Sequence, residues 1–177
     1  RAAAKAIDGP VLIYNLAGFV SPIEADTIVR LIEKVPNLVG VKDSSGSLES
    51  LEKLSAAEFP SCRILGNDTV LVEALRRNLI DAVISGPTGV VPEVTVALFE
   101  ASSVGDEDRF ERLATLFDEA IAQFEQLPYP WALKTVAEAR GLFPARLPFP
   151  PGPDRQAQLA EVRAWLEGWL PRIARLG

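Results

Sequence analysis

The sequence contains no histidine and no methionine, and Cys62 is its one cysteine. Without histidine, the Ser-His-Asp and Cys-His nucleophile systems are excluded, together with the commonest nitrogen ligand of zinc and iron. A lone cysteine makes no internal disulfide, and the apolar run around Cys62 is typical of a buried structural thiol. Carboxylates, lysines and tyrosines are therefore the groups left for acid-base or nucleophilic chemistry.

Clusters of basic residues and long apolar runs are also absent. The formal charge of −6 and the pI near 4.8 argue against a nucleic-acid surface, which needs grouped lysines and arginines. No run approaches the roughly 20 apolar residues that span a bilayer, and no secretory leader opens the sequence. We expect a cytoplasmic protein without nucleic-acid or membrane partners. Because its first residues read like a helix tail, we also expect the sequence to begin inside a larger protein.

Four short apolar runs alternate with helical patterns in the first half of the sequence. Polar alternation is missing from each run, which predicts strands buried on both faces of a parallel sheet. The runs are Val11–Tyr14, Leu38–Lys42, Cys62–Leu65 and Ala82–Ser85. Three helices are predicted between these runs. The first has Ser21 as N-cap and Pro22 as its first residue, the second extends from Ser47 to Glu58, and the third includes Val70 to Leu75. This order predicts an α/β fold of four βα units, which is half of a (β/α)8 barrel.

The pattern becomes wholly helical in the second half. Helices are predicted over Pro92–Val104, Asp106–Gln126, Pro130–Arg140 and Pro153–Arg175. The segment Phe143–Pro151 is too rich in proline for a helix or a central strand, so we expect an extended strap there. We expect a partial barrel over residues 1–104 and a helical extension over residues 105–177.

Lys42 is the candidate nucleophile. It stands at the carboxyl end of the second apolar run and before the small polar turn Asp43–Ser47. In a (β/α)8 barrel the active site lies in the loops after the strands' carboxyl ends. Desolvation at such a place would lower an amine pKa from about 10.4 toward neutrality, and a neutral amine attacks carbonyl carbons. The other lysines fit predicted helices.

Tyr14 and Ser44 are the side chains most easily combined with Lys42. Tyr14 ends the preceding run at the matching position, where its phenol could relay protons near an imine. Spacing alone favours the plainer interpretation of a half-buried aromatic with its hydroxyl in water. Ser44 and Ser45 could hydrogen-bond a polyhydroxy substrate, or serve only as local backbone partners.

Two other kinds of site are weakly indicated. Gly40–Ser47 looks superficially like a phosphate loop, but Gly46 is followed by Ser47 and not by Lys-Ser/Thr. Asp43, Asp68 and Asp81 could form a carboxylate metal site, yet each lies at an element boundary where aspartate commonly caps. We therefore expect no metal.

Ordered motifs mark the four strand ends and the late helical region. They are Tyr14-Asn15, Gly40-Val41-Lys42-Asp43, Gly66-Asn67-Asp68, Val83-Ile84-Ser85-Gly86, Trp131-Ala132-Leu133-Lys134, Gly141-Leu142 and Arg146-Leu147-Pro148-Phe149-Pro150. Together they resemble the dihydrodipicolinate synthase and N-acetylneuraminate lyase family. That family consists of class I pyruvate aldolases and lyases on a (β/α)8 TIM barrel with a helical extension, usually homotetramers. The resemblance implies that this chain corresponds to the C-terminal half of the barrel, strands five to eight, and forms a homo-oligomer.

The resemblance also implies roles for four residues. Lys42 would form the Schiff base with the keto carbon of pyruvate or another 2-oxo acid, and Tyr14 would relay protons. Ser44 would contact the substrate through its hydroxyl, and Ile84 would lie beside the bound pyruvyl group through its backbone. A carbon-carbon bond is then made or broken beside the imine, without any metal or organic cofactor.

Two departures from the family pattern bear on function. An arginine that holds the second substrate's carboxylate in the synthases has no counterpart in Leu16–Val20. The Gly-Val-Lys-Asp form and the Leu-Pro-Phe-Pro-Pro strap look closer to 2-keto-3-deoxy sugar-acid aldolases. We therefore expect aldolase activity of that type. The alternatives are a dihydrodipicolinate synthase and a non-catalytic half-barrel interaction subunit. The Gly-Thr/Ser-Thr/Ser-Gly-Glu loop that grips the pyruvate carboxylate is also missing. We therefore expect activity only where a second polypeptide or a second copy completes the barrel, and an open edge on Val11–Tyr14 otherwise.

Overall fold

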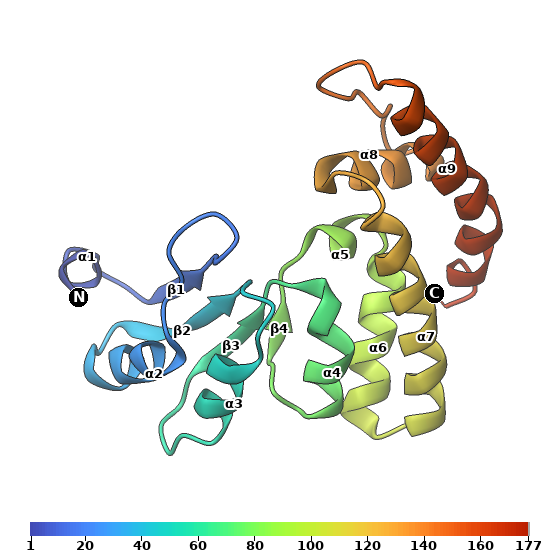
Figure 1. The fold of residues 1–177 in the computed structure, drawn as a ribbon. Helices are drawn as coiled ribbons and strands as arrows, with labels where there is room; N and C mark the ends of the chain where they lie inside the picture. The colour runs from blue at the N-terminus through green and yellow to red at the C-terminus, as the bar shows by residue number, and fades with distance from the viewer. Residues whose placement is uncertain (177) are drawn as a thin grey trace. The chain divides into compact units, whose positions relative to one another are not determined.

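The computed structural model describes residues 1–176 and divides into two compact units, Arg1–Ser85 and the residues from Gly86 onward (Figure 1). The first unit contains α1 (Ala2–Lys5), β1 (Val11–Asn15), α2 (Ala25–Lys34), β2 (Leu38–Asp43), α3 (Glu49–Ser55), β3 (Cys62–Leu65), the 3-10 helix η1 (Asp68–Val70), α4 (Leu71–Arg76) and β4 (Ala82–Val83). The second contains α5 (Gly86–Val90), α6 (Pro92–Val104), α7 (Glu107–Phe124), α8 (Tyr129–Ala139) and α9 (Pro153–Ile173).

A parallel sheet forms the centre of the first unit. Its strand order β1-β2-β3-β4 follows the sequence, and each pair of neighbours is connected through helical segments. The register places Tyr14 opposite Lys42 and Asn15 opposite Asp43. The α/β class and the parallel βα arrangement predicted from the sequence are therefore confirmed.

The two faces of the sheet differ in burial. On one face α2 and α3 lie side by side against the strands, and Ile28, Val41 and Leu51 there are fully buried (Figure 1). On the other face, Leu12 is 42% exposed and Tyr14 is 50% exposed. Burial on both faces, which the apolar runs predicted, is therefore wrong for β1. Within the described residues β1 pairs with β2 alone, so its outer edge is open.

The start of α2 corrects a second prediction. Ser21 and Pro22 give a local signal for a helix start, but α2 begins at Ala25 with Glu24 at its N-cap. The reason is a tertiary contact, because the Asn15 amide accepts from the Ile23 N–H at 3.1 Å and donates to the Ile23 carbonyl at 3.5 Å. Binding both backbone groups of Ile23 keeps this residue out of the helix.

Two smaller differences concern element ends, and a third concerns a short helix. Leu48, and not Ser47, occupies the N-cap position of α3, although Ser47 Oγ still accepts from the Glu49 N–H at 3.2 Å. The fourth strand ends at Val83 and not at Ser85. The short helix α5 lies over Gly86–Val90, where the sequence patterns predict no helix. Predicted ends shift by a few residues because helix ends depend on contacts outside the local pattern.

The second unit is built from helices packed through large apolar side chains. Phe117, Leu166 and Trp169 are almost completely buried, and the Trp169 indole N–H donates to the Leu116 carbonyl at 3.2 Å. Helix α6, which the sequence patterns assigned to the barrel part, belongs to this unit. The division of the chain at residue 104 is a statement about family architecture and stays a prediction.

The proline-rich strap between α8 and α9 has no helix or strand, as predicted. Two polar contacts fasten it to α8. Lys134 Nζ donates to the Arg146 carbonyl at 2.6 Å, and the Ala145 N–H donates to Glu138 at 3.0 Å. Gln156 of α9 also donates to the Pro151 carbonyl at 2.8 Å, so the strap is an irregular segment held by side chains from both flanking helices.

Candidate functional site

Lys42 and Tyr14 meet at the carboxyl ends of β2 and β1. The Lys42 ammonium donates a hydrogen bond to the Tyr14 hydroxyl at 3.4 Å, and its nitrogen lies 4.5 Å from the centre of the phenol ring. The strand register causes this meeting, since opposite residues of a parallel pair project to the same face. The structure therefore brings together the two residues that the sequence singled out as nucleophile and proton relay.

The pKa of Tyr14 is lowered below its ordinary value of 10.0. The Ser44 hydroxyl is the largest cause, and the hydrogen bond and positive charge of Lys42 add to it, while desolvation acts in the opposite direction. Ser44 Oγ is buried and has no hydrogen-bond partner of standard geometry within residues 1–176. It lies near enough to the phenol to favour phenolate, yet no standard hydrogen bond joins the pair. The Ser44 hydroxyl can therefore form a hydrogen bond with another group.

A buried polar network fixes the strand ends beneath these side chains. Asp43 is 2% exposed and accepts hydrogen bonds from Asn15 Nδ2 at 3.2 Å, from the Ser45 N–H at 2.8 Å and from Ser50 Oγ. The Ser44 N–H donates to the Asn15 carbonyl at 2.8 Å. A buried carboxylate that is satisfied in this way holds its partners in one arrangement. The network therefore positions the backbone from which Tyr14 and Lys42 project.

The absence of a side chain at Gly66 leaves space for the Lys42 side chain. A Cβ atom at this position would lie 2.7 Å from Lys42 Cε and 2.0 Å from Ser44 Oγ. Such separations are shorter than van der Waals contact, so any larger residue would displace the lysine or the serine. The Gly66 N–H also donates to the Asp43 carbonyl at 2.8 Å, which ties the end of β3 to the end of β2.

Asp68 is the site residue that sequence reasoning missed. Its local sequence predicts a helix cap, but burial raises its pKa above the ordinary value, against a hydrogen bond from Ser85 and the charge of Lys42. Its Oδ1 atom is buried without a hydrogen-bond partner in the described part of the chain. A carboxyl group after the next strand, in the motif Gly66-Asn67-Asp68, was the signal that could have identified it.

Ile84 lies at the same edge of the sheet, directly after β4. Its N–H donates to the Leu65 carbonyl at 2.9 Å, which extends the strand pairing by one residue beyond Val83. Its side chain is 53% exposed. The backbone at Ile84 is therefore fixed, two strands away from Lys42.

The alternative metal site does not assemble from the residues that suggested it. Asp43 is occupied by the network described above, and Asp81 pairs with Arg63 at 2.7 Å. Across residues 1–176, no cluster of three or more acidic or cysteine side chains is arranged to hold a metal ion. Within the same residues, no helix has the length and apolar character needed to cross a membrane.

Comparison with known proteins connects this arrangement to one family. The model of the dihydrodipicolinate synthetase family matches residues 1–167. A 4-hydroxy-tetrahydrodipicolinate synthase of Listeria monocytogenes is 33% identical over 177 residues, which cover 94% of this chain and 57% of the relative. The corresponding enzyme of Sorangium cellulosum is 31% identical over 170 residues, covering 94% of this chain and 56% of the relative. The chain thus spans little more than half the length of these relatives.

Solved structures share the fold. A 4-hydroxy-tetrahydrodipicolinate synthase of Methylacidiphilum fumariolicum superposes with a TM-score of 0.80 at 24% identity, covering 99% of this chain and 60% of that one. A variant of the 2-keto-3-deoxygluconate aldolase of Sulfolobus solfataricus gives a TM-score of 0.74 at 19% identity, covering 94% and 56%. At such identities the likeness establishes the fold alone. With the family model matched along almost the whole chain, we conclude that this protein belongs to the dihydrodipicolinate synthetase family.

Proposed function

We propose that this chain carries the reacting lysine of a class I aldolase or lyase that joins or cleaves pyruvate and an aldehyde. The observation that carries the proposal is the contact between Lys42 and Tyr14 at the carboxyl edge of a parallel sheet. An amine beside a phenol of lowered pKa supplies the nucleophile and the proton carrier that imine chemistry needs. Family membership supports the same reading.

The proposed cleavage follows from these two groups. Lys42 Nζ attacks the keto carbon, the carbonyl oxygen leaves as water, and a protonated imine forms. The Tyr14 oxygen accepts the proton of the hydroxyl next to the scissile bond, and the electrons of that bond move into the imine to give an enamine and an aldehyde. Protonation of the enamine and hydrolysis of the imine then release pyruvate and free the lysine. Synthesis runs through the same steps in reverse.

We propose a 2-keto-3-deoxy sugar acid as the substrate type. Two buried oxygens in the segments after β2 and β3, Ser44 Oγ and Asp68 Oδ1, have no hydrogen-bond partner within residues 1–176, and the charge of Lys42 acts on Asp68. Unpaired buried polar atoms are costly, so a substrate rich in hydroxyl groups would be favoured by pairing with them. The raised pKa of Asp68 lets its carboxyl group donate as well as accept a hydrogen bond at higher pH than usual.

The synthase activity is the second candidate. It is favoured by the curated relatives, which are 4-hydroxy-tetrahydrodipicolinate synthases. Against it stands the loop Leu16–Val20, which offers no cation for a second carboxylate. Phe19 at this place is 85% exposed.

We further propose that the sheet described here is the C-terminal half of a (β/α)8 barrel, within a homo-oligomeric cytoplasmic enzyme. The open edge of β1 and the exposed face at Leu12 and Tyr14 support this proposal, because a barrel would cover both. The other half would supply the groups that grip the pyruvate carboxylate. If nothing supplies them, the half-barrel serves as a non-catalytic interaction subunit.

A substrate panel with lysine variants tests the proposed function in the complete protein. Pyruvate release from 2-keto-3-deoxygluconate should be measured beside condensation of pyruvate with aspartate semialdehyde. We expect turnover of the sugar acid by the wild type and by Lys53→Arg, which alters a surface lysine, and none by Lys42→Arg. Turnover of aspartate semialdehyde without turnover of the sugar acid would contradict the proposed substrate and favour the synthase activity. Activity retained in Lys42→Arg would overturn the mechanism.

A further inference from the structure

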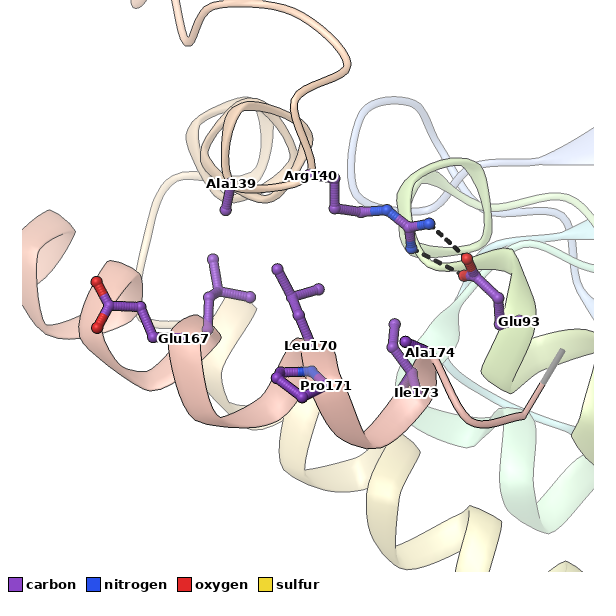
Figure 2. Close-up of a pocket in the computed structure, with 9 residues that line it drawn as sticks. Glu93, Ala139, Arg140, Glu167, Leu170, Pro171, Ile173 and Ala174 are labelled. Atoms are coloured by element: carbon purple, nitrogen blue, oxygen red, sulfur yellow. Dashed lines mark hydrogen bonds and ion pairs between the residues drawn. The ribbon is translucent and has the colours of Figure 1, made fainter.

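The charged groups around a pocket of the second unit are paired or directed away from it. This pocket has a volume of about 400 Å³ and is lined mainly by apolar residues of α8 and α9. Figure 2 shows Arg140 bound to Glu93 and the Glu167 carboxylate directed away from the opening. In the first unit, by contrast, Asp68 Oδ1 is a buried acceptor without a hydrogen-bond partner within residues 1–176.

The partner of this carboxyl group is Ser85, the second residue after β4. Burial raises the pKa of Asp68, while the hydrogen bond that the Ser85 hydroxyl donates and the charge of Lys42 act against it. A serine hydroxyl has one proton and two acceptor lone pairs. Because Ser85 gives its one proton to Asp68, its oxygen can only accept a hydrogen bond from any further group. Ser85 is therefore oriented as an acceptor.

The Lys42 side chain approaches the strand next to the segment that carries Ser85. Lys42 belongs to β2, but a Cβ atom on Gly66, the residue after β3, would lie 2.7 Å from Lys42 Cε. Strand β4 follows β3 in the sheet, and the Ile84 N–H donates to the Leu65 carbonyl, which extends their pairing to the residue before Ser85. Neighbouring strands lie about 4.8 Å apart. About one strand spacing therefore separates the end of the lysine from this segment.

We propose that Ser85 is a specificity-determining residue, which accepts a hydrogen bond from a substrate hydroxyl beyond the scissile bond, and that Asp68 positions it for this contact. The proposal rests on the proposed function, because Lys42 must hold the keto carbon. Carbon-carbon bonds are about 1.5 Å long, so hydroxyl-bearing carbons three or four bonds from the keto carbon reach about one strand spacing away. The hydroxyl groups at the far end of a sugar acid meet this condition.

Two substrates separate this recognition from the bond cleavage. 2-Keto-3-deoxygluconate carries hydroxyl groups beyond the scissile bond, whereas 4-hydroxy-2-oxopentanoate has the same reacting groups and ends in a methyl group. Pyruvate release from both should be measured with the complete protein. We expect Ser85→Ala to lower kcat/KM for the sugar acid about tenfold, the size of one lost hydrogen bond, and to do so mainly through KM. The short substrate should change by less than about twofold, because it offers no hydroxyl to Ser85.

Two further variants sharpen the test, and turnover of the short substrate shows that each variant is folded. Ser85→Thr keeps the hydroxyl group and should keep most of the preference for the sugar acid. Ser55→Ala, which changes an exposed serine at the end of α3, is the control and should behave like the wild type. Equal losses for both substrates in Ser85→Ala, or no loss for either, would overturn the role of Ser85 while Lys42 still reacts. A wild type that releases pyruvate from neither substrate would refute the proposed function, and this role with it.

Discussion

The two units of this chain reach a fixed structure by different means. In the first unit, the decisive contacts at the strand ends are polar, with Asp43 and Asn15 buried and hydrogen-bonded to each other. In the second unit, stability comes from large apolar side chains such as Phe117 and Trp169. Apolar packing is non-directional, whereas hydrogen bonds fix orientation. The difference teaches that directional contacts are concentrated where Lys42 and Tyr14 must be held in register.

After the complete loss expected for Lys42→Arg, the largest effect predicted for the first unit comes from removing the Tyr14 hydroxyl. Tyr14→Phe should lower turnover about 10²- to 10⁴-fold, the range for loss of a positioned proton carrier. The fold should be kept, because Tyr14 is half exposed. Steady-state kinetics and a thermal melt on the same sample measure both effects. Turnover within a few-fold of the wild type would mean that the phenol carries no proton in the rate-limiting step.

The second unit should respond to a change of the opposite kind. Trp169→Ala removes a side chain that is 1% exposed, stacks on Trp165 at 5.1 Å and donates to the Leu116 carbonyl. We expect the free energy of unfolding to fall by about 3 to 5 kcal/mol, as for other buried aromatics. Urea unfolding gives the value. A loss below about 1 kcal/mol would contradict the assignment of this tryptophan to the core.

A glycine pair tests the spacing around Lys42. Gly66→Ala places a Cβ atom against Lys42 Cε and Ser44 Oγ, and a displacement of the reacting amine by about 1 Å should lower turnover about 10²-fold. Gly18→Ala is the matched control in the same unit, because nothing lies within 4 Å of its added Cβ. Pyruvate release by the two variants should therefore differ widely. Similar rates would show that the Lys42 side chain tolerates crowding.

The smallest predicted effect is a shift in the titration of Tyr14. The chain has two tyrosines, so a Tyr129→Phe background leaves Tyr14 alone to report in ultraviolet absorbance. We expect its pKa to lie below 10.0 and to rise toward that value in Ser44→Ala, since Ser44 is the largest cause of the lowering. With the folded pKa below the unfolded one, ionised Tyr14 favours the folded state above pH 10.0, and this contribution disappears as the pH falls through the folded value. An unchanged pKa in Ser44→Ala would remove the serine from this role.

Much of the arrangement in the first unit was accessible from the sequence. Apolar runs of strand length, each followed by a helical pattern, specify a parallel sheet, and the sheet register then brings Tyr14 and Lys42 together. The place of Lys42 at a strand end was readable because a charged residue interrupts an apolar run there. The helix start at Pro92 was equally readable, since proline is favoured at the first helical position.

Other features depend on contacts between distant residues and were not readable. Ser21 lost its capping role because Asn15 binds the backbone of Ile23 across the loop. The exposure of the sheet face at Leu12 could not be predicted from the apolar residues of β1. Apolar residues favour burial, but they do not show whether another part of the protein covers that face. The raised pKa of Asp68 depends on its burial in the folded chain, whereas its local sequence looks like an ordinary helix start.

The most direct test of the account is to trap the imine. The complete protein should be incubated with pyruvate, reduced with borohydride, and digested for peptide mapping by mass spectrometry, with Lys42→Arg treated in parallel. We predict one reduced pyruvyl adduct per chain, located on Lys42, and none in the variant. An adduct on another lysine, or no adduct on the intact wild-type protein, would contradict the claim that Lys42 is the nucleophile.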